Sequence, residues 1–152
     1  MNIKVLEVLL WSIALPGFGQ LLNKNYVKGI LFLLLEMLIN LQSGFNKLII
    51  LSFHGNTHAA LEQVNFQWLM FYPCLYFFAM WDAVKDAYEG EACSPLLFLP
   101  FVFIAYAVTV GLIYSPKITI FGYLAGPVFL PILFIIPGVI IGLVAKKLIN
   151  RS

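Results

Sequence analysis

The stretch ITIFGYLAGPVFLPILFIIPGVIIGLVAKK, residues 118–147, carries no charged side chain until its terminal lysine pair. As a helix, residues 118–145 would be about 40 Å long, which exceeds the ~30 Å hydrocarbon core of a bilayer. Three prolines should kink this helix, and neighbouring helices must bond the carbonyls that they free; they are Pro127, Pro131 and Pro137. The stretch predicts a transmembrane helix.

The composition of the whole chain supports the same environment. Of its 152 residues, 62% are hydrophobic and 11% are charged, whereas soluble domains have about 45–50% apolar and about 25% charged residues. We therefore predict an all-α, polytopic transmembrane bundle of about five helices. The net charge of +2 is too small to indicate nucleic-acid binding, and no motif indicates a cofactor.

Outward from the opening stretch, apolar segments divide one membrane domain, residues 1–152. We expect an N-terminal helical hairpin at 3–41, an outer loop with an interfacial helix at 42–65, and transmembrane helices at 64–88, 95–114 and 118–145. The first helix should break at Leu15-Pro16-Gly17, because proline and glycine disrupt helices. We predict that residues 3–22 nevertheless span the bilayer, with a re-entrant segment as the alternative.

Basic residues predict the orientation, because Lys and Arg are retained on the cytoplasmic side. With five crossings, one side holds Lys24, Lys28, Lys85, Lys146, Lys147 and Arg151, and the other holds Lys4, Lys47 and Lys117. We therefore expect a multi-pass protein of the cell membrane with a cytoplasmic C-terminus and an N-terminus outside.

A proline-glycine motif lies between the first two segments. It reads Leu15-Pro16-Gly17-Phe18-Gly19-Gln20-Leu21-Leu22, then Asn23-Lys24-Asn25-Tyr26 and Lys28-Gly29. The motif resembles the two-transmembrane-hairpin domain of small bacterial membrane proteins, over residues 3–41 and more loosely over 76–90. Trp81-Asp82-Ala83 is similar to an aromatic-Asp-Ala element of such relatives. The resemblance implies a membrane-embedded hairpin and no catalytic residue.

From the residues themselves, this motif is a structural turn, with a ligand site as the alternative. Gly17 and Gly19 permit positive φ and close approach, and Gln20 can satisfy carbonyls freed where the helix breaks after Pro16. Gly29 lets a neighbouring helix approach closely.

Glu36 is the candidate for intramembrane chemistry. It lies roughly 15 Å into the second segment, where an acid is costly and tends to be functional. If the first two helices pack antiparallel, Glu7 lies at a similar depth, so we predict a polar cluster of Glu36 with Glu7 or Asn40. The alternatives are a single buried helix–helix hydrogen bond and a proton or ion path.

Two other groups of polar residues are weaker candidates. His54 and His58 have the i, i+4 spacing of a helical metal site, but Gly55-Asn56 disfavours a helix, so we predict no metal there. An acidic cluster follows the third segment: Asp82, Asp86, Glu89 and Glu91. It lacks the spacing of a calcium loop, and it is either a solvated helix end, a partner surface or an anchor for Lys24 and Lys28.

Small residues recur at every fourth position, which allows membrane helices to approach closely. Three stripes result: Ala79, Ala83 and Ala87; Gly122 and Gly126; Gly138 and Gly142. They predict helix packing within the chain, in a homo-oligomer or against another membrane protein.

These patterns favour a structural or accessory membrane protein that acts through helix packing and partners. The alternatives are a small transporter or channel component that uses Glu36, and an intramembrane enzyme. The sequence has no phosphate loop, nucleophile elbow or metalloprotease helix.

Overall fold

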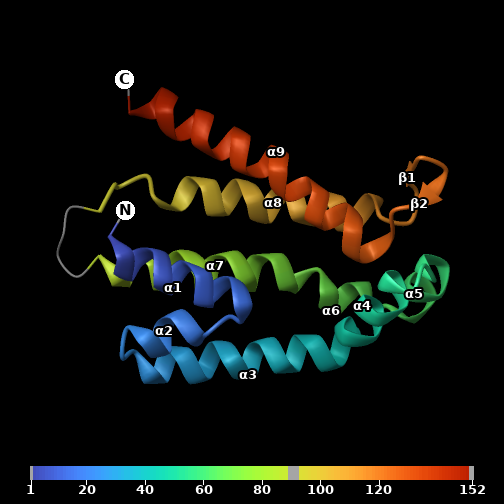
Figure 1. Cartoon of the computed structure of the whole chain (residues 1–152), viewed down its shortest axis with the longest axis horizontal. Coiled ribbons are helices and arrows are strands. Elements are labelled where there is room, and N and C mark those ends of the chain that lie inside the picture. The colour runs from blue at the N-terminus through green and yellow to red at the C-terminus, as the bar shows by residue number, and fades with distance from the viewer. Residues whose placement is uncertain (1, 89–92, 151–152) are drawn as a thin grey trace.

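The computed structural model describes residues 2–88 and 93–150, and most of them are helical (Figure 1). The elements in chain order are α1 (Ile3–Ala14), α2 (Phe18–Leu22), α3 (Tyr26–Ser43), α4 (Phe45–Phe53), α5 (Thr57–Gln63), α6 (Phe66–Leu69), α7 (Phe71–Ala87), α8 (Phe98–Tyr114), β1 (Thr119–Ile120), β2 (Tyr123–Leu124) and α9 (Gly126–Ile149). The predicted predominance of helix is confirmed.

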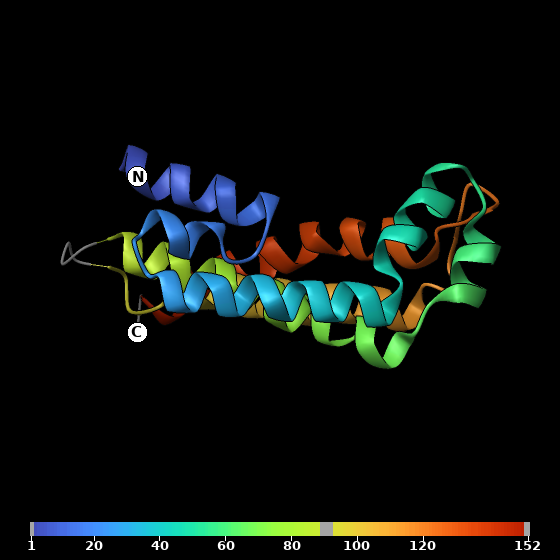
Figure 2. The same cartoon turned by 90° about the horizontal axis from the view of Figure 1, so that it is seen from below.

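Long helices run back and forth along the molecule, so their ends gather at two places (Figure 1). Only Met70, which is itself helical, separates α6 from α7. Together with α3, α8 and α9, they make four lengthwise passes. The short helices α4 and α5 lie at one end, and α1 begins and α9 ends at the other (Figures 1 and 2). The expected placement of the termini at opposite ends is therefore wrong.

The predicted break in the first segment is present, but its consequence differs from our expectation. Leu15 is extended and Gly17 has φ 106°, so the chain reverses and α2 returns alongside α1. The hydroxyl of Tyr76 donates to the Ile13 carbonyl, which places the end of α1 beside the first half of α7. Residues 3–22 therefore form a short helical hairpin, because Pro16-Gly17 turns the chain back instead of kinking one continuous helix.

The segment 118–125 is also different from the prediction. We expected the last helix to begin at Ile118, whereas β1 and β2 form an antiparallel hairpin and α9 begins at Gly126. Phe121 and Gly122 have φ 51° and 84°, the two positive values that a tight two-residue hairpin turn requires. Gly122 therefore belongs to a turn, not to a helix-packing stripe.

Buried residues form small clusters between neighbouring helices instead of one central core. One joins α1 to the end of α7, a second joins α4, α5 and α6 to α8 and α9, and a third joins α7 to α8. Their buried members are Val5, Val8, Ala83, Val84 and Ala87; Leu48, Ala60, Leu69, Leu112 and Val128; and Phe77, Met80, Ile104 and Val108.

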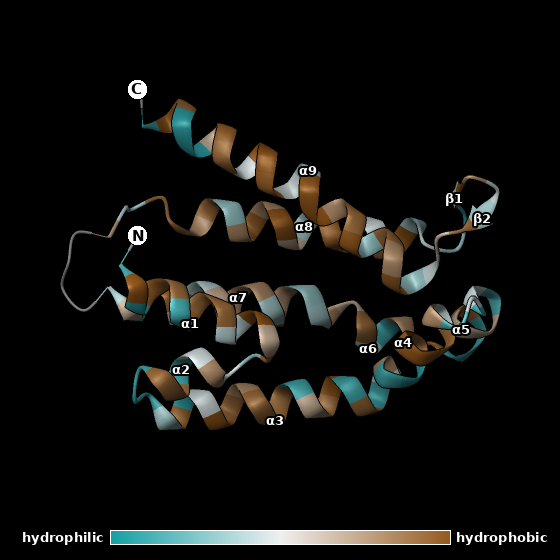
Figure 3. Ribbon diagram, in the orientation of Figure 1, coloured by the Kyte–Doolittle hydropathy of each residue, from teal (hydrophilic) through white to brown (hydrophobic). Residues whose placement is uncertain are grey.

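The outward faces of the long helices are apolar (Figure 3). In α9 alone, Ile136 is 60% exposed and Ile140 is 57% exposed. Within the described part of the chain, α3 and α9 are long and apolar enough to cross a membrane, and α8 is a shorter apolar helix. The two helices are evidence for a membrane location by length and composition.

Candidate functional site

The proline-glycine motif docks on the C-terminal half of α7. Gln20, on α2, is fully buried. Its Nε2 donates to the Ala79 carbonyl at 2.8 Å and to Asp82 Oδ2 at 3.1 Å. We expected Gln20 to bond carbonyls at its own helix break, but it bonds a neighbouring helix, because the reversal at Gly17 carries α2 onto α7.

The turn between α2 and α3 extends this contact along α7. Asn23 Nδ2 donates to the Ala83 carbonyl at 2.8 Å, one turn beyond the Ala79 carbonyl. Asn25 Nδ2 donates to Asp86 Oδ2, also at 2.8 Å. Three amide side chains therefore follow three successive steps along one face of α7.

Lys28 completes the contact from the first turn of α3. Its Nζ lies 2.8 Å from Asp82 Oδ1 and 3.0 Å from Asp86 Oδ2. The i, i+4 spacing places both carboxylates on one helix face, so a single cation pairs with both. Among the expected anchors, Lys28 makes these ion pairs, while Lys24 is exposed at the turn with φ 62°. Glu89 and Glu91 lie outside the described residues.

We call this set the polar network. It consists of Gln20, Asn23, Asn25 and Lys28 on one side and Ala79, Asp82, Ala83 and Asp86 on the other. It joins the two parts of the sequence that carried the family resemblance. Two of its amide oxygens, Gln20 Oε1 and Asn23 Oδ1, are buried without a hydrogen-bond partner among the described residues.

Glycines in the motif are required by close approach. A Cβ at Gly19 would lie 2.1 Å from Ser12 Oγ and 2.7 Å from Ala83 Cβ. A Cβ at Gly17 would lie 2.6 Å from the Gly29 carbonyl oxygen, and one at Gly29 would lie 2.6 Å from Leu21. The motif therefore holds α2 within backbone distance of both α1 and α3.

The alanine stripe of α7 is the surface on which this hairpin rests. Ala79 and Ala83 are fully buried, and Ala87 is 2% exposed. Val5 and Val8 of α1 pack in the same cluster as the last two. Small side chains on α7 therefore let both α1 and α2 approach its backbone.

Glu36, on α3, contacts a different part of α7, near its start. It is 6% exposed, and its Oε1 accepts from Asn40 Nδ2 at 3.2 Å and from the Tyr72 hydroxyl at 3.5 Å. Glu7 is exposed on α1, whose neighbours Val5 and Val8 pack near Ala83. Ala83 and Tyr72 are roughly 16 Å apart along α7, so the structure brings Glu36 to Asn40 and not to Glu7.

The histidines remain at the far end of the molecule. His54 caps the end of α4, His58 lies in α5, and both are exposed. Gly55 between them has φ 79° and ends the helix, as the sequence suggested. Across residues 2–88 and 93–150, no three His, Cys, Asp or Glu side chains gather in a metal-binding arrangement.

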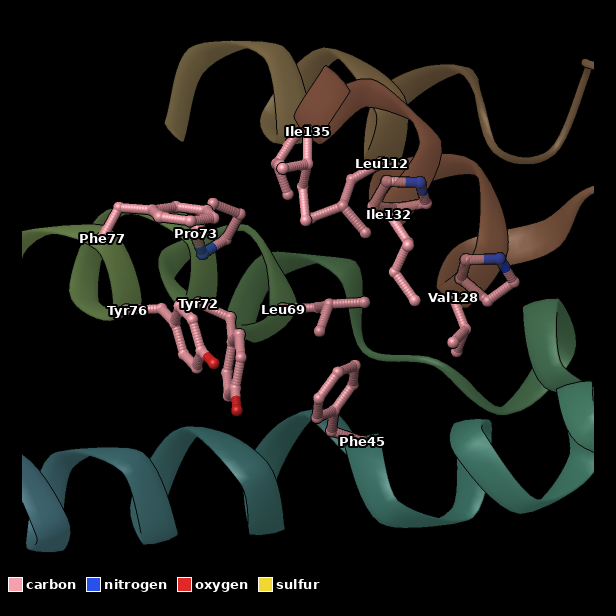
Figure 4. Close-up of a pocket in the computed structure, with 13 residues that line it drawn as sticks. Phe45, Leu69, Tyr72, Pro73, Tyr76, Phe77, Leu112, Val128, Ile132 and Ile135 are labelled. Atoms are coloured by element: carbon pink, nitrogen blue, oxygen red, sulfur yellow. The ribbon is translucent and has the colours of Figure 1, made fainter. Parts of the chain in front are cut away.

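A cavity of about 250 Å³ lies between α6–α7 and the α8–α9 pair (Figure 4). Its walls are hydrocarbon and aromatic, with Leu69, Phe77 and Ile135 as examples. The hydroxyls of Tyr72 and Tyr76 point towards α3, away from Ile132 and Ile135 (Figure 4). The cavity therefore offers space for apolar groups and few ligands for an ion.

The glycines of α9 lie directly against the backbone of α8. A Cβ at Gly138 would lie 2.7 Å from Ile104 Cα, and one at Gly142 would lie 2.6 Å from Pro100 Cα. Gly126, at the start of α9, instead faces α5, and a Cβ at Gly126 would lie 3.1 Å from Thr57 Cβ. Gly122 has open space around it.

Tyr72 was not predicted as a partner of Glu36, and Asn23 and Asn25 were predicted only as turn residues. Asn25 and Lys28 are three residues apart and Asp82 and Asp86 are four residues apart, and both spacings place side chains on one helix face. That complementary spacing was a usable signal. Nothing in the sequence pairs Tyr72 with Glu36, because the chain has seven tyrosines and this contact joins residues 36 positions apart.

Comparison of the chain with protein-family models gives no match, and comparisons with curated proteins and with solved structures give none either. The site must therefore be interpreted from its own geometry. Its described side chains are amides, carboxylates and one ammonium, with no nucleophile beside a base among them. Its polar groups bond to one another and fix the N-terminal hairpin on α7.

Proposed function

We propose that this chain is a small integral membrane protein of structural or accessory type. It crosses the bilayer four times, through α3, α6–α7, α8 and α9, and inserts α1–α2 as a re-entrant hairpin from the side of the polar network. It acts through helix packing and through partners in the membrane. The observation that carries this proposal is the apolar outward surface of the long helices, between two ends where polar residues gather.

Soluble monomers rarely expose contiguous apolar patches larger than a few hundred Å². On α3, the large apolar side chains that face outward are Val27, Ile30, Leu31, Leu34, Met37, Leu38 and Leu41. They recur on every turn of this 18-residue helix, which would be about 27 Å long. That length matches the ~30 Å core of a bilayer.

The re-entrant hairpin strengthens the charge asymmetry from which the orientation is inferred. It moves Lys4 to the end that holds the polar network. Among the described residues, this end then holds Lys4, Lys24, Lys28, Lys85, Lys146 and Lys147, and the other end holds Lys47 and Lys117. Six basic residues against two favour a cytoplasmic location for this end. Both termini are then cytoplasmic.

The environment of Glu36 favours the accessory role over transport. A transporter that used Glu36 would need polar groups leading to it from both ends. Glu36 is bonded to Asn40 and Tyr72, Glu7 is distant, and the neighbouring cavity is lined by hydrocarbon. One intramembrane acid with two donors is sufficient to join α3 to α7, and it provides no path.

The proposed topology is tested by labelling single cysteines in cells. In a background with Cys74→Ser and Cys93→Ser, a membrane-impermeant maleimide should label Lys117→Cys in intact cells. It should label Asn2→Cys and Lys147→Cys only after permeabilisation. Labelling of Asn2→Cys in intact cells would overturn the re-entrant hairpin, and release of the protein from membranes by alkaline carbonate would overturn membrane integration.

The accessory role is tested by photo-crosslinking in cells from Leu34, which is 59% exposed on α3. The expected product is a defined adduct with a second membrane protein or with another copy of the chain. Adducts with lipid alone would contradict a role that depends on partners at this face. A parallel assay of proton or ion flux in proteoliposomes should give no flux above that of empty vesicles.

A further inference from the structure

A groove of about 600 Å³ runs between α7 and α8 on the outward surface of the molecule. It extends from Trp81 and Phe98 at the end nearer the polar network to Cys74 and Thr109 at its other end. Its volume falls within the range of about 300–1,000 Å³ that is typical of small-molecule sites. Its walls are almost entirely apolar. The groove is open to the surroundings on the side of α8 where its lining residues Val102 and Tyr106 are exposed.

The residues that α7 contributes lie in a single stripe. Cys74, Phe78 and Trp81 are spaced four and three residues apart, so they lie on one face of the helix. Lys85 is the next member of this stripe, four residues beyond Trp81. Its Nζ lies 5.1 Å from the centre of the Trp81 ring, so a positive charge stands at the mouth of an apolar groove.

This charge is available to a ligand. Lys85 is exposed, and its ammonium has no carboxylate within ion-pair distance in the parts of the chain that the structure describes. Asp82 and Asp86, its neighbours in sequence, are paired with Lys28 on another face of α7. Among the described residues, these two neighbouring carboxylates are therefore engaged by Lys28 and not by Lys85.

We propose that the groove binds an anionic phospholipid, with an acyl chain between α7 and α8 and the phosphate on Lys85. The inference rests on the proposed membrane location, in which Lys85 lies at the cytoplasmic end of α7. Tryptophan and lysine are favoured at the headgroup level, and the cytoplasmic leaflet supplies anionic lipids. An apolar slot with a cation at its interfacial end matches an apolar chain with an anionic head.

The charge favours a lipid over a second helix as occupant. A helix from another copy would have to bring an acidic side chain to Lys85, or else bury its ammonium beside Trp81 at a high cost in desolvation. A phospholipid phosphate is an anion at the depth of Lys85. In this binding mode the rest of the lipid stays in the bilayer, so only one acyl chain needs to enter the groove.

Quenching of Trp81 fluorescence by brominated lipids tests the proposal. The full chain carrying Trp11→Phe and Trp68→Phe has Trp81 as its single reporter. It is reconstituted in phosphatidylcholine vesicles that contain brominated phosphatidylglycerol or, in matched samples, the same fraction of brominated phosphatidylcholine. We expect preferential quenching by the anionic lipid. Lys85→Gln should lower this preference about fivefold, since a lysine near a membrane surface contributes about 1 kcal/mol.

Two variants separate the site from general effects of charge and packing. Lys147→Gln removes a charge at the same end, on α9, and should leave the preference unchanged. Val102→Phe places a ring in the open side of the groove and should reduce quenching by the anionic lipid while the fold, followed by circular dichroism, is retained.

Two outcomes would overturn the lipid proposal, and a third would overturn the membrane location. Equal quenching by both lipids would show an unselective lipid-facing surface and would overturn the proposal. Absence of quenching together with an oxidative Cys74–Cys74 cross-link in a Cys93→Ser background would place a second copy in the groove, with the same consequence. If neither brominated lipid quenches Trp81, Trp11 or Trp68 in the corresponding single-tryptophan chains, the membrane location itself fails.

Discussion

The contacts that fix the N-terminal segment on α7 differ in kind from those that join α8 to α9. Side chains between positions 20 and 28 donate hydrogen bonds from amide and ammonium groups to carbonyl and carboxylate oxygens of α7. These bonds are 2.8–3.1 Å long. The α8–α9 pair has no such network among its described residues. There, glycines of α9 lie against the backbone of α8 at Ile104 and Pro100.

In the proposed membrane location, this difference follows from what a bilayer offers to each pair of helices. Lipid tails are as apolar as leucine, so hydrophobic burial gives membrane helices little reason to associate. Close backbone packing and interhelical hydrogen bonds remain. The long α9 uses packing along its length. The short α1 and α2 also pack closely on the alanine stripe of α7, but polar bonds from Gln20, Asn23 and Asn25 are added near the end of the bundle.

Breaking the packed half should have the largest effect. In Gly138→Leu, even the first side-chain atom would lie 2.7 Å from Ile104 Cα, which is backbone and cannot rotate away. We expect a loss of about 3 kcal/mol in the free energy of unfolding, measured by thermal or steric-trap unfolding in mild detergent. Val144→Leu, on the exposed side of α9, is the matched control and should change it by less than ~0.5 kcal/mol. Equal effects of the two variants would contradict this account of α9.

The sequence predicted much of this half in advance. The charge-free run, the lysine pair that ends it, and the four-residue spacing of Gly138 and Gly142 are local features that follow the helical period. The β-hairpin at 119–124 was missed because its apolar residues continue the hydrophobic run without interruption. Only the neighbouring positive φ values of Phe121 and Gly122 distinguish it, and these depend on the folded backbone.

The N-terminal half was less predictable. The break at Pro16-Gly17 followed from residue type, but the direction of the chain after the break did not. A kinked continuous helix and a reversed hairpin share the same local sequence, and the contacts of Gln20 and Asn23 with α7, some 60 residues away, decide between them. Such long-range pairing leaves a weak trace in one sequence.

Removing hydrogen bonds from the polar network should have an intermediate effect on the free energy of unfolding. Gln20→Leu removes the donors to the Ala79 carbonyl and to Asp82, but it also removes Oε1, a buried acceptor without a partner among the described residues. These effects oppose one another, so we expect a loss of about 1–2 kcal/mol together with increased proteolysis of the N-terminal hairpin. The exposed Gln42→Leu on α3 is the control. A loss as large as that of Gly138→Leu would show that the two halves are not held by different means.

Glu36→Gln should have the smallest effect, since it tests a polar contact that lies outside the network. Glutamine retains Oε1, which can still accept from Tyr72 and Asn40, so we expect a change of less than about 0.5 kcal/mol in the free energy of unfolding. Glu36→Leu removes that acceptor and leaves two donors to find other partners, so its loss should be larger, about 1–2 kcal/mol. If Glu36→Gln were as destabilising as Glu36→Leu, the negative charge itself would be required, and an ion path through α3 and α7 would again have to be considered. A small effect would instead show that the contact needs a hydrogen-bond acceptor and not a negative charge. Glu36 then joins α3 to α7 between the polar network and the apolar cavity.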